Sequence, residues 1–273
     1  MACMDRELLR LVPRVLRARD FHLYLEGGKR LTDLWRSGGK AVLGHKRPRV
    51  LVELKNAAER GLFCALPHPM EKRFIKALGE FFPERQFRLY LNEGSMYQAL
   101  DKAGISDPVP LWRPFIREQG YCLNKEPDSG LSSDKMKIFI PVLPWPMGPE
   151  VLVLDKSMED SFPSGELIPP VLLAPAARAL YDLAGFMKTK TLPRYPKISK
   201  ALSQDKSNGS DAVVWRRQGI YLTTETKGEE YAALFRKFLE GGFLIPPSPA
   251  EPVILPLSMS GGEESKLAQL IVS

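Results

Sequence analysis

The sequence predicts an α/β protein, because segments with the patterns of strands and of helices follow each other along its 273 residues. Near the N-terminus two short apolar segments flank the glycine pair Gly27-Gly28, which predicts a β-hairpin. Pro48 then opens a segment with helical spacing of apolar residues, and Gly61 marks its end. Residues 211–258 read as strand, turn, strand, helix, strand and strand. Both ends of the chain are therefore expected to mix helices with strands.

The remaining elements are predicted from periodicity and from the positions of proline. Residues 1–19 read as a helix that Pro13 bends or splits. Twelve of the 24 prolines lie between residues 108 and 175, so long helices are excluded from most of that stretch. Leu202–Ser210 has the composition of a linker. Further helices are expected to begin at Pro67 or Pro69 and to cover 95–103 and 171–188, and further strands to cover 87–91, 137–143 and 150–154.

The net charge of +7 is concentrated in the first part of the chain. Residues 1–100 hold 19 Lys and Arg against 11 Asp and Glu, whereas residues 101–273 hold 20 against 21. Five arginines fall within residues 6–19, on a segment whose apolar residues have helical spacing, so a solvated basic face is one interpretation. Nucleic-acid binding through residues 6–19 is the alternative. No aromatic residues interleave these arginines, which disfavours a groove for single strands.

The cysteines and the apolar segments favour a cytoplasmic protein. Cys3, Cys64 and Cys122 form no C-x-x-C pair, which argues against a disulfide framework or a zinc site and favours a reducing compartment. The N-terminus lacks the apolar region of a secretory signal. The apolar run 138–154 is interrupted by four prolines, so it is not expected to span a membrane.

The stretch HLYLEGGKRLTDLWRSGGKAVLGHKRPRVLVELKNAAERGLF, residues 22–63, resembles the N-terminal segment of class III aminotransferases, the pyridoxal-phosphate (PLP) enzymes of fold type I. That family shares the order Gly-Lys-Arg, a Gly-rich stretch, Leu-Gly-His, a proline and a helix. The resemblance implies an α+β small domain of a fold type I enzyme with a strongly shortened large domain. It divides the chain into an N-terminal aminotransferase-like segment (1–104), a proline-rich remnant of the large domain (105–204) and a C-terminal small-domain segment (205–273) that packs on the N-terminal part.

The resemblance also implies where PLP would be held. Family members place the phosphate at a helix start that carries Ser-Gly-Ser/Thr-Glu-Ala, and Gly94-Ser95 stand at the similar position here. An ordinary Ser-capped helix is the other interpretation of that stretch. Lys156 ends the segment PEVLVLDK, which looks like the strand that carries the Schiff-base lysine, and an exposed lysine after an edge strand is the alternative. The acidic pair for the ring nitrogen and the Tyr-His-Gly that stacks on the ring are not found.

These features favour a degenerate aminotransferase-like protein, a pseudoenzyme without transaminase activity, that acts by binding a partner or an anionic ligand at Gly94-Ser95. The competing hypothesis is a minimal PLP-dependent enzyme that uses Lys156. Dimerisation is the expectation from the family, as a homodimer or as a heterodimer with an intact paralogue.

Overall fold

A computed structural model describes residues 6–116, 136–158, 162–189, 191–205 and 214–272. The contacts between residues divide the chain into two compact units. Unit 1 consists of Met1–Lys46 and Thr191–Ser273, and unit 2 of Arg47–Lys190. The three-part division of the chain that the resemblance implies stays a prediction.

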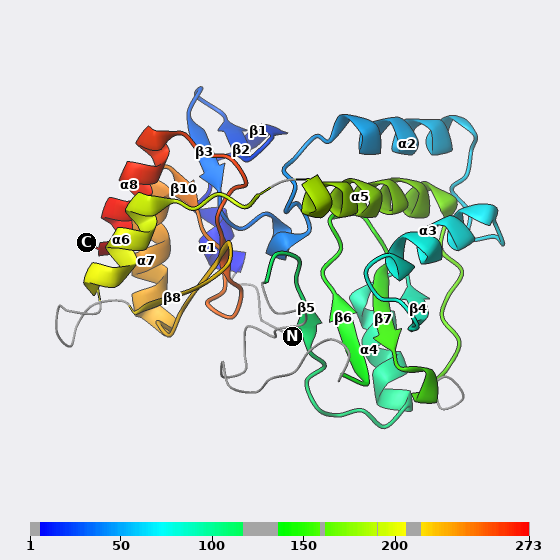
Figure 1. Cartoon of the computed structure of the whole chain (residues 1–273). Helices are drawn as coiled ribbons and strands as arrows, with labels where there is room; N and C mark the ends of the chain where they lie inside the picture. The colour runs from blue at the N-terminus through cyan, green and yellow to red at the C-terminus, as the bar shows by residue number, and fades with distance from the viewer. Residues whose placement is uncertain (1–5, 117–135, 159–161, 190, 206–213, 273) are drawn as a thin grey trace. The chain divides into compact units, whose positions relative to one another are not determined.

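Unit 1 contains two sheets (Figure 1). The first has the order β1-β2-β3-β10, in which β1 (Val15–Arg19), β2 (His22–Leu25) and β3 (Arg30–Asp33) are antiparallel and β10 (Phe243–Leu244) lies parallel to β3. The second has the order β11-β9-β8. Its strands are β8 (Trp215–Gln218), β9 (Tyr221–Thr224) and β11 (Val253–Ile254). The pairing of β3 with β10 joins a strand near the N-terminus to one near the C-terminus.

The helices of unit 1 are α1 (Arg6–Arg10), α6 (Pro196–Asp205), α7 (Gly228–Glu240) and α8 (Gly261–Val272). The first of these corrects the sequence prediction, since the expected helix over residues 1–19 ends at Arg10 and residues 15–19 form β1. Pro13 cannot donate a helical hydrogen bond, and Val15 begins a segment that gains sheet hydrogen bonds with β2 instead. Residues 196–205 form a helix, so the predicted linker overlaps α6, and its residues 206–210 lie outside the described residues. Helix α8 was not predicted.

Unit 2 is built around the sheet β4-β7-β6-β5. Strand β7 (Glu150–Leu154) is antiparallel both to β4 (Gln86–Tyr90) and to β6 (Ile138–Pro141), while β5 (Leu111–Trp112) is parallel to β6. The helices of the unit are α2 (Pro48–Glu59), α3 (Pro69–Gly79), α4 (Glu93–Lys102) and α5 (Pro170–Thr189). Apart from shifts of a few residues at their ends, the sequence predicts these elements except for β5, a two-residue strand that lies in the proline-rich stretch.

The core of unit 2 has three layers, because β7 buries side chains on both of its faces. Val151 and Val153 belong to an apolar cluster with α3 and α5, whereas Leu152 and Leu154 belong to a second cluster with α4. All four side chains are fully buried. Helix α5 packs against both α2 and α3, and Figure 1 shows it running across the unit between α2 and the strands.

Candidate functional site

The predicted phosphate site lies at the start of α4, directly after β4. Asn92 caps this helix, because its side-chain Oδ1 accepts a hydrogen bond from the backbone N–H of Ser95 at 3.0 Å. The backbone N–H of Met96 donates to the carbonyl oxygen of Asn92 at 3.2 Å. The side-chain oxygen of Asn92 thus occupies one of the N–H groups that a phosphate would need, and the capping residue is Asn92 rather than Ser95.

Carboxylates surround this helix start. Glu166 accepts a hydrogen bond from the backbone N–H of Leu91 at 2.7 Å, and Glu93 is the first residue of α4. Burial raises the pKa of Tyr97, and the negative charges of Glu93 and Glu150 raise it further, which places both carboxylates near that ring. A phosphate dianion at Ser95 would therefore meet repulsion from several acidic groups.

Lys156 lies at the other end of the strand pair β4–β7. The register pairs Gln86 with Leu154 and Tyr90 with Glu150, so β7 ends where β4 begins. Lys156 follows that end in a short 3-10 helix, Lys156–Met158, and is exposed in an ion pair with Glu84. A five-residue strand spans about 17 Å. Lys156 and Ser95 lie beyond opposite ends of this strand pair.

The sheet end that does hold Ser95 is formed by the connection between β6 and β7 and by the residues after β5. The connection, residues 142–149, is VLPWPMGP, and the described residues after β5, 113–116, are RPFI. Neither of these two stretches contains a lysine that could form a Schiff base beside Ser95. The residues present there do not fit PLP, because the chemistry requires a lysine beside the phosphate pocket.

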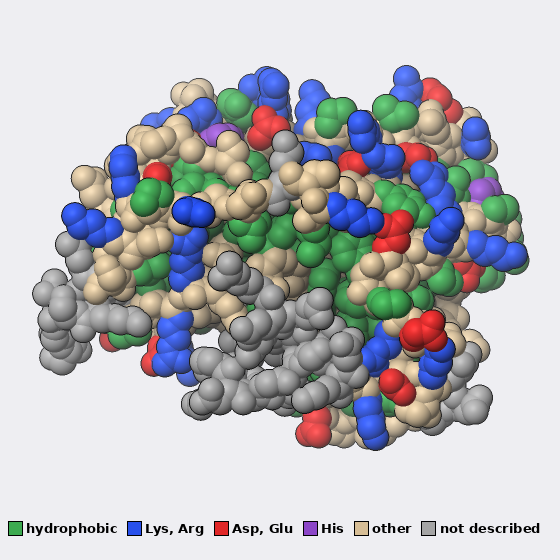
Figure 2. All heavy atoms as spheres, viewed as in Figure 1, with side chains coloured by type: hydrophobic (Ala, Val, Ile, Leu, Met, Phe, Trp, Pro, Cys, Tyr) green, Lys and Arg blue, Asp and Glu red, His purple; other side chains and the backbone are tan. Residues whose placement is uncertain are grey.

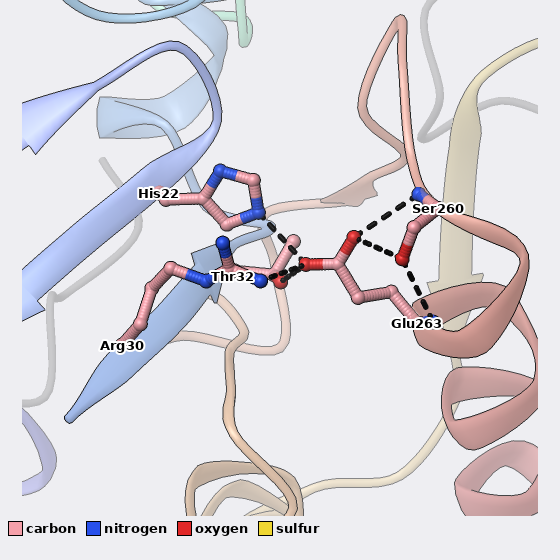
Figure 3. Close-up of polar contacts among 5 residues, drawn as sticks. All are labelled: His22, Arg30, Thr32, Ser260 and Glu263. Atoms are coloured by element: carbon pink, nitrogen blue, oxygen red, sulfur yellow. Dashed lines mark hydrogen bonds and ion pairs between the residues drawn. The ribbon is translucent and has the colours of Figure 1, made fainter.

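A second polar cluster lies in unit 1 around Glu263, in the first turn of α8 (Figure 3). One carboxylate oxygen contacts His22 Nε2 at 2.8 Å and accepts hydrogen bonds from Arg30 and Thr32, both at 3.2 Å. The other oxygen accepts from the backbone N–H of Ser260 at 3.0 Å and from its hydroxyl at 2.7 Å. The backbone N–H of Glu263 in turn donates to the Ser260 hydroxyl at 3.2 Å, which completes a capping box.

The hydroxyl of Ser260, the carboxylate of Glu263 and the imidazole of His22 contact each other in that order, which indicates a structural role. Burial raises the pKa of Glu263, but the hydrogen bonds from Ser260 and His22 outweigh it and lower the pKa to about 2. Figure 3 shows the carboxylate between Ser260 and His22. The imidazole therefore has no contact through which to accept the proton of the hydroxyl, as a nucleophilic triad requires. The cluster ties α8 to strands β2 and β3.

A third polar cluster fixes the turn after β3. The carboxylate of Asp33 accepts from the backbone N–H groups of Trp35 and Arg36 and contacts His45 Nε2 at 2.8 Å. Arg36 is fully buried, and its guanidinium donates to the carbonyl oxygens of Val42, at 3.1 Å, and of Ile254. Burial lowers the pKa of Arg36 to about 10, against the charge of Asp33. A buried arginine at position 36 leaves no signal in the pattern of the chain.

The described residues contain neither a cluster of metal ligands nor a membrane-spanning helix. No three His, Cys, Asp or Glu side chains gather there as a metal ion would require. None of the helices in that part of the chain has the length and apolarity needed to cross a membrane.

Solved structures with the same fold are PLP-dependent aminotransferases. The match to an ornithine aminotransferase from Plasmodium yoelii has a TM-score of 0.71 at 12% identity and covers 98% of this chain and 96% of that one. The match to an omega-transaminase from Sphaerobacter thermophilus has a TM-score of 0.62 at 12% identity, with 98% and 95% covered. The chain therefore has the α/β fold of fold type I aminotransferases. Because the alignments run over nearly the whole of these chains, the shortening of the large domain stays a prediction.

Sequence comparison gives relatives of two kinds. An uncharacterised protein of Treponema pallidum is 26% identical over 299 residues, with 94% of this chain and 93% of that protein covered. A glutamate-1-semialdehyde 2,1-aminomutase of Thermus thermophilus is 29% identical over 83 residues, which are 30% of this chain and 20% of that enzyme. No protein-family model matches the chain. The likeness to known aminotransferase-type enzymes is therefore one of fold over the whole chain and one of sequence over a short segment.

Proposed function

We propose that this chain is a pseudoenzyme of the aminotransferase fold, which does not catalyse amino transfer and acts by binding a partner. The observation that carries the proposal is the separation of Lys156 from Gly94-Ser95 at opposite ends of β4 and β7. A Schiff base to Lys156 would leave the phosphate of PLP far from the start of α4.

The anionic ligand predicted at Gly94-Ser95 has less support than a protein partner. Asn92 takes up a backbone N–H of the helix start, and the carboxylates of Glu93 and Glu166 lie close to it. We also propose the assembly that is expected from the family, which is a homodimer or a heterodimer with an intact paralogue. Its proposed location is the cytoplasm. Light scattering coupled to gel filtration tests the homodimer, and a strict monomer would exclude it.

The experiment that tests the loss of the cofactor site is a titration of the purified protein with PLP, followed by its visible absorption and by borohydride reduction. The matched variants are Lys156→Ala and Lys227→Ala, which remove two exposed lysines of which only Lys156 is a candidate for the Schiff base. We expect no saturable band, and only scattered modification of surface lysines that is equal in both variants.

The competing hypothesis, a minimal PLP enzyme, predicts the reverse. A saturable band that Lys156→Ala abolishes and Lys227→Ala retains, together with conversion of the bound cofactor to its amine form by an amino donor, would overturn the pseudoenzyme proposal. Peptide mapping of the reduced adduct would then show whether Lys156 is the residue modified.

A further inference from the structure

Strand β1 is the terminal strand of its sheet, and its outer edge has no strand partner among the described residues. A free strand edge presents unpaired backbone N–H and C=O groups, which can pair with another extended chain. The side chains around this edge are exposed, including those of three aliphatic residues, Leu11, Val15 and Leu16, at 44%, 45% and 71%. An exposed edge of this kind is suited to a bound peptide segment.

The charge of the edge is strongly positive. Arg10, Arg14, Arg17 and Arg19 are all exposed within ten residues, and basic side chains lie in Figure 2 where Figure 1 shows β1 and β2. Asp20 pairs with Arg19 at 3.5 Å, with both groups exposed, and the exposed Glu26 lies beside Arg14, whose carbonyl oxygen accepts from the Glu26 backbone N–H. An exposed pair of this kind neutralises little of the field of the other arginines.

The register of β1 fixes which way its side chains point. Arg17 lies opposite Tyr24 and Arg19 opposite His22, so both arginines share the face of the sheet that carries the Glu263 cluster. The guanidinium of Arg17 lies 4.2 Å from the centre of the Tyr24 ring. Ala18 lies opposite the buried Leu23 and so points to the other, apolar face. A strand added to β1 would meet arginine, alanine and arginine in turn.

We propose that the outer edge of β1 binds an acidic, extended peptide segment of a partner protein by strand addition. Its acidic residues, spaced two apart, would lie across from Arg17 and Arg19, where opposite charges on neighbouring strands attract. The residue between them would be aliphatic and would lie beside Ala18, on the apolar face. This inference rests on the proposed function, because it names the kind of partner that the pseudoenzyme would bind.

Two other occupants fit the edge less well. A second copy of the chain, paired edge to edge through β1, would bring arginines against arginines, and like charges on facing strands are destabilising. Nucleic acid fits the charge, but residues 15–19 are a short strand rather than the basic helix that the sequence suggests, and the Tyr24 ring is already covered by Arg17.

The binding test uses fluorescence anisotropy with the full chain and a labelled peptide, acetyl-Ser-Glu-Val-Glu-Val-Ser-amide. Two control peptides separate strand addition from plain charge attraction. One has the same composition with the order Glu-Glu-Val-Val, which breaks the alternation, and the other carries N-methyl groups on alternate amides, which removes the backbone donors. Only the alternating, unmethylated peptide is expected to bind, and a labelled oligo-dT is expected to bind at least about tenfold more weakly than that peptide.

The matched protein variants are Arg17→Glu/Arg19→Glu and Arg49→Glu/Arg236→Glu, which change the net charge equally at exposed positions. We expect the first to weaken peptide binding at least about tenfold and the second to leave it within about twofold. Equal binding of the control peptides, equal effects of the two variants, tighter binding of the oligonucleotide, or no binding at all would overturn the proposal. None of these outcomes bears on the PLP titration, so the two proposals fail separately.

Discussion

Units 1 and 2 both bury an apolar core, but they differ in how their segments of chain are joined. Unit 2 is a layered core in which apolar residues of one continuous stretch of chain, 47–190, pack on both faces of a sheet. Unit 1 is assembled from the two ends of the chain, and buried or half-buried polar groups join them. Arg36 reaches Ile254, His22 reaches Glu263, and Trp35 Nε1 donates to Glu251 at 2.5 Å. An apolar core tolerates substitutions that keep its volume and its pattern of apolar positions. A buried hydrogen-bonding group, in contrast, must find one particular partner.

The difference matters for function, because a fold can be kept after its chemistry is lost. In unit 2 the apolar positions of β7 and α5 maintain the layers although the described residues at the sheet end beside α4 do not fit PLP. In unit 1 hydrogen bonds between polar side chains, such as that of His22 with Glu263, hold the sheet whose edge strand is β1. The proposed partner surface therefore depends on unit 1, and the proposed loss of catalysis concerns unit 2.

The largest effect is expected from Phe139→Ala in unit 2. The Phe139 ring is fully buried and lies edge-on to Phe82 with ring centres 5.0 Å apart. Removing a buried aromatic ring costs about 3–5 kcal/mol through lost burial and the cavity that remains. Denaturant unfolding would measure the loss, and native-state hydrogen exchange would place it in the amides of unit 2.

Phe63→Ala is the control, because this phenylalanine is 59% exposed and its removal should cost less than about 0.5 kcal/mol. If both variants lost equal stability, or if the amides of unit 1 lost protection as much as those of unit 2, the contrast between the units would be wrong.

A smaller loss, about 2–3 kcal/mol, is expected from Arg36→Met in unit 1. The methionine fills much of the volume but leaves the carbonyl oxygens of Val42 and Ile254 without their donor. Arg216→Met is the control, since its ion pair with Glu225 is exposed and should contribute under about 0.5 kcal/mol. Hydrogen exchange should show the loss in unit 1, and an unchanged or raised midpoint of unfolding for Arg36→Met would mean that these hydrogen bonds add nothing to stability.

The sequence predicts the helices and strands of unit 2 better than it predicts which side chains contact each other in unit 1, and the reason is physical. Apolar alternation and proline positions are local signals, and they placed β7 at Glu150–Leu154 and α2 from Pro48. They could not show that β7 runs antiparallel to β4, which separates Lys156 from Ser95, because strand direction depends on tertiary pairing. The contacts of Glu263 with β2 and β3 span more than 200 residues of chain, and no local pattern encodes them. The Ser260-to-Glu263 capping box is a local signal for the start of α8.

The smallest and most specific effect is expected from Glu263→Gln, and it should depend on pH. The pKa of this carboxyl is about 2 in the folded chain and about 4.5 as its ordinary value. Because the folded pKa is the lower one, the ionised carboxylate stabilises the fold above about pH 4.5, and this stabilisation disappears as the pH falls towards 2. At pH 7 the variant should lose about 2 kcal/mol, less than the full shift implies because the group is partly solvated.

The unfolding free energies of the Glu263→Gln variant and of the unmodified protein, measured between pH 7 and pH 2.5, should therefore converge at the acid end. Glu230→Gln, at an exposed position in the first turn of α7, is the matched control and should track the unmodified protein at every pH. A gap between Glu263→Gln and the unmodified protein that stayed constant down to pH 2.5 would show that the variant disturbs packing rather than removing a stabilised charge. A difference in unfolding free energy that closes at low pH would show that the ionised carboxylate of Glu263 links α8 to the sheet. The sheet that includes β1 would then lose part of its stabilisation in acid.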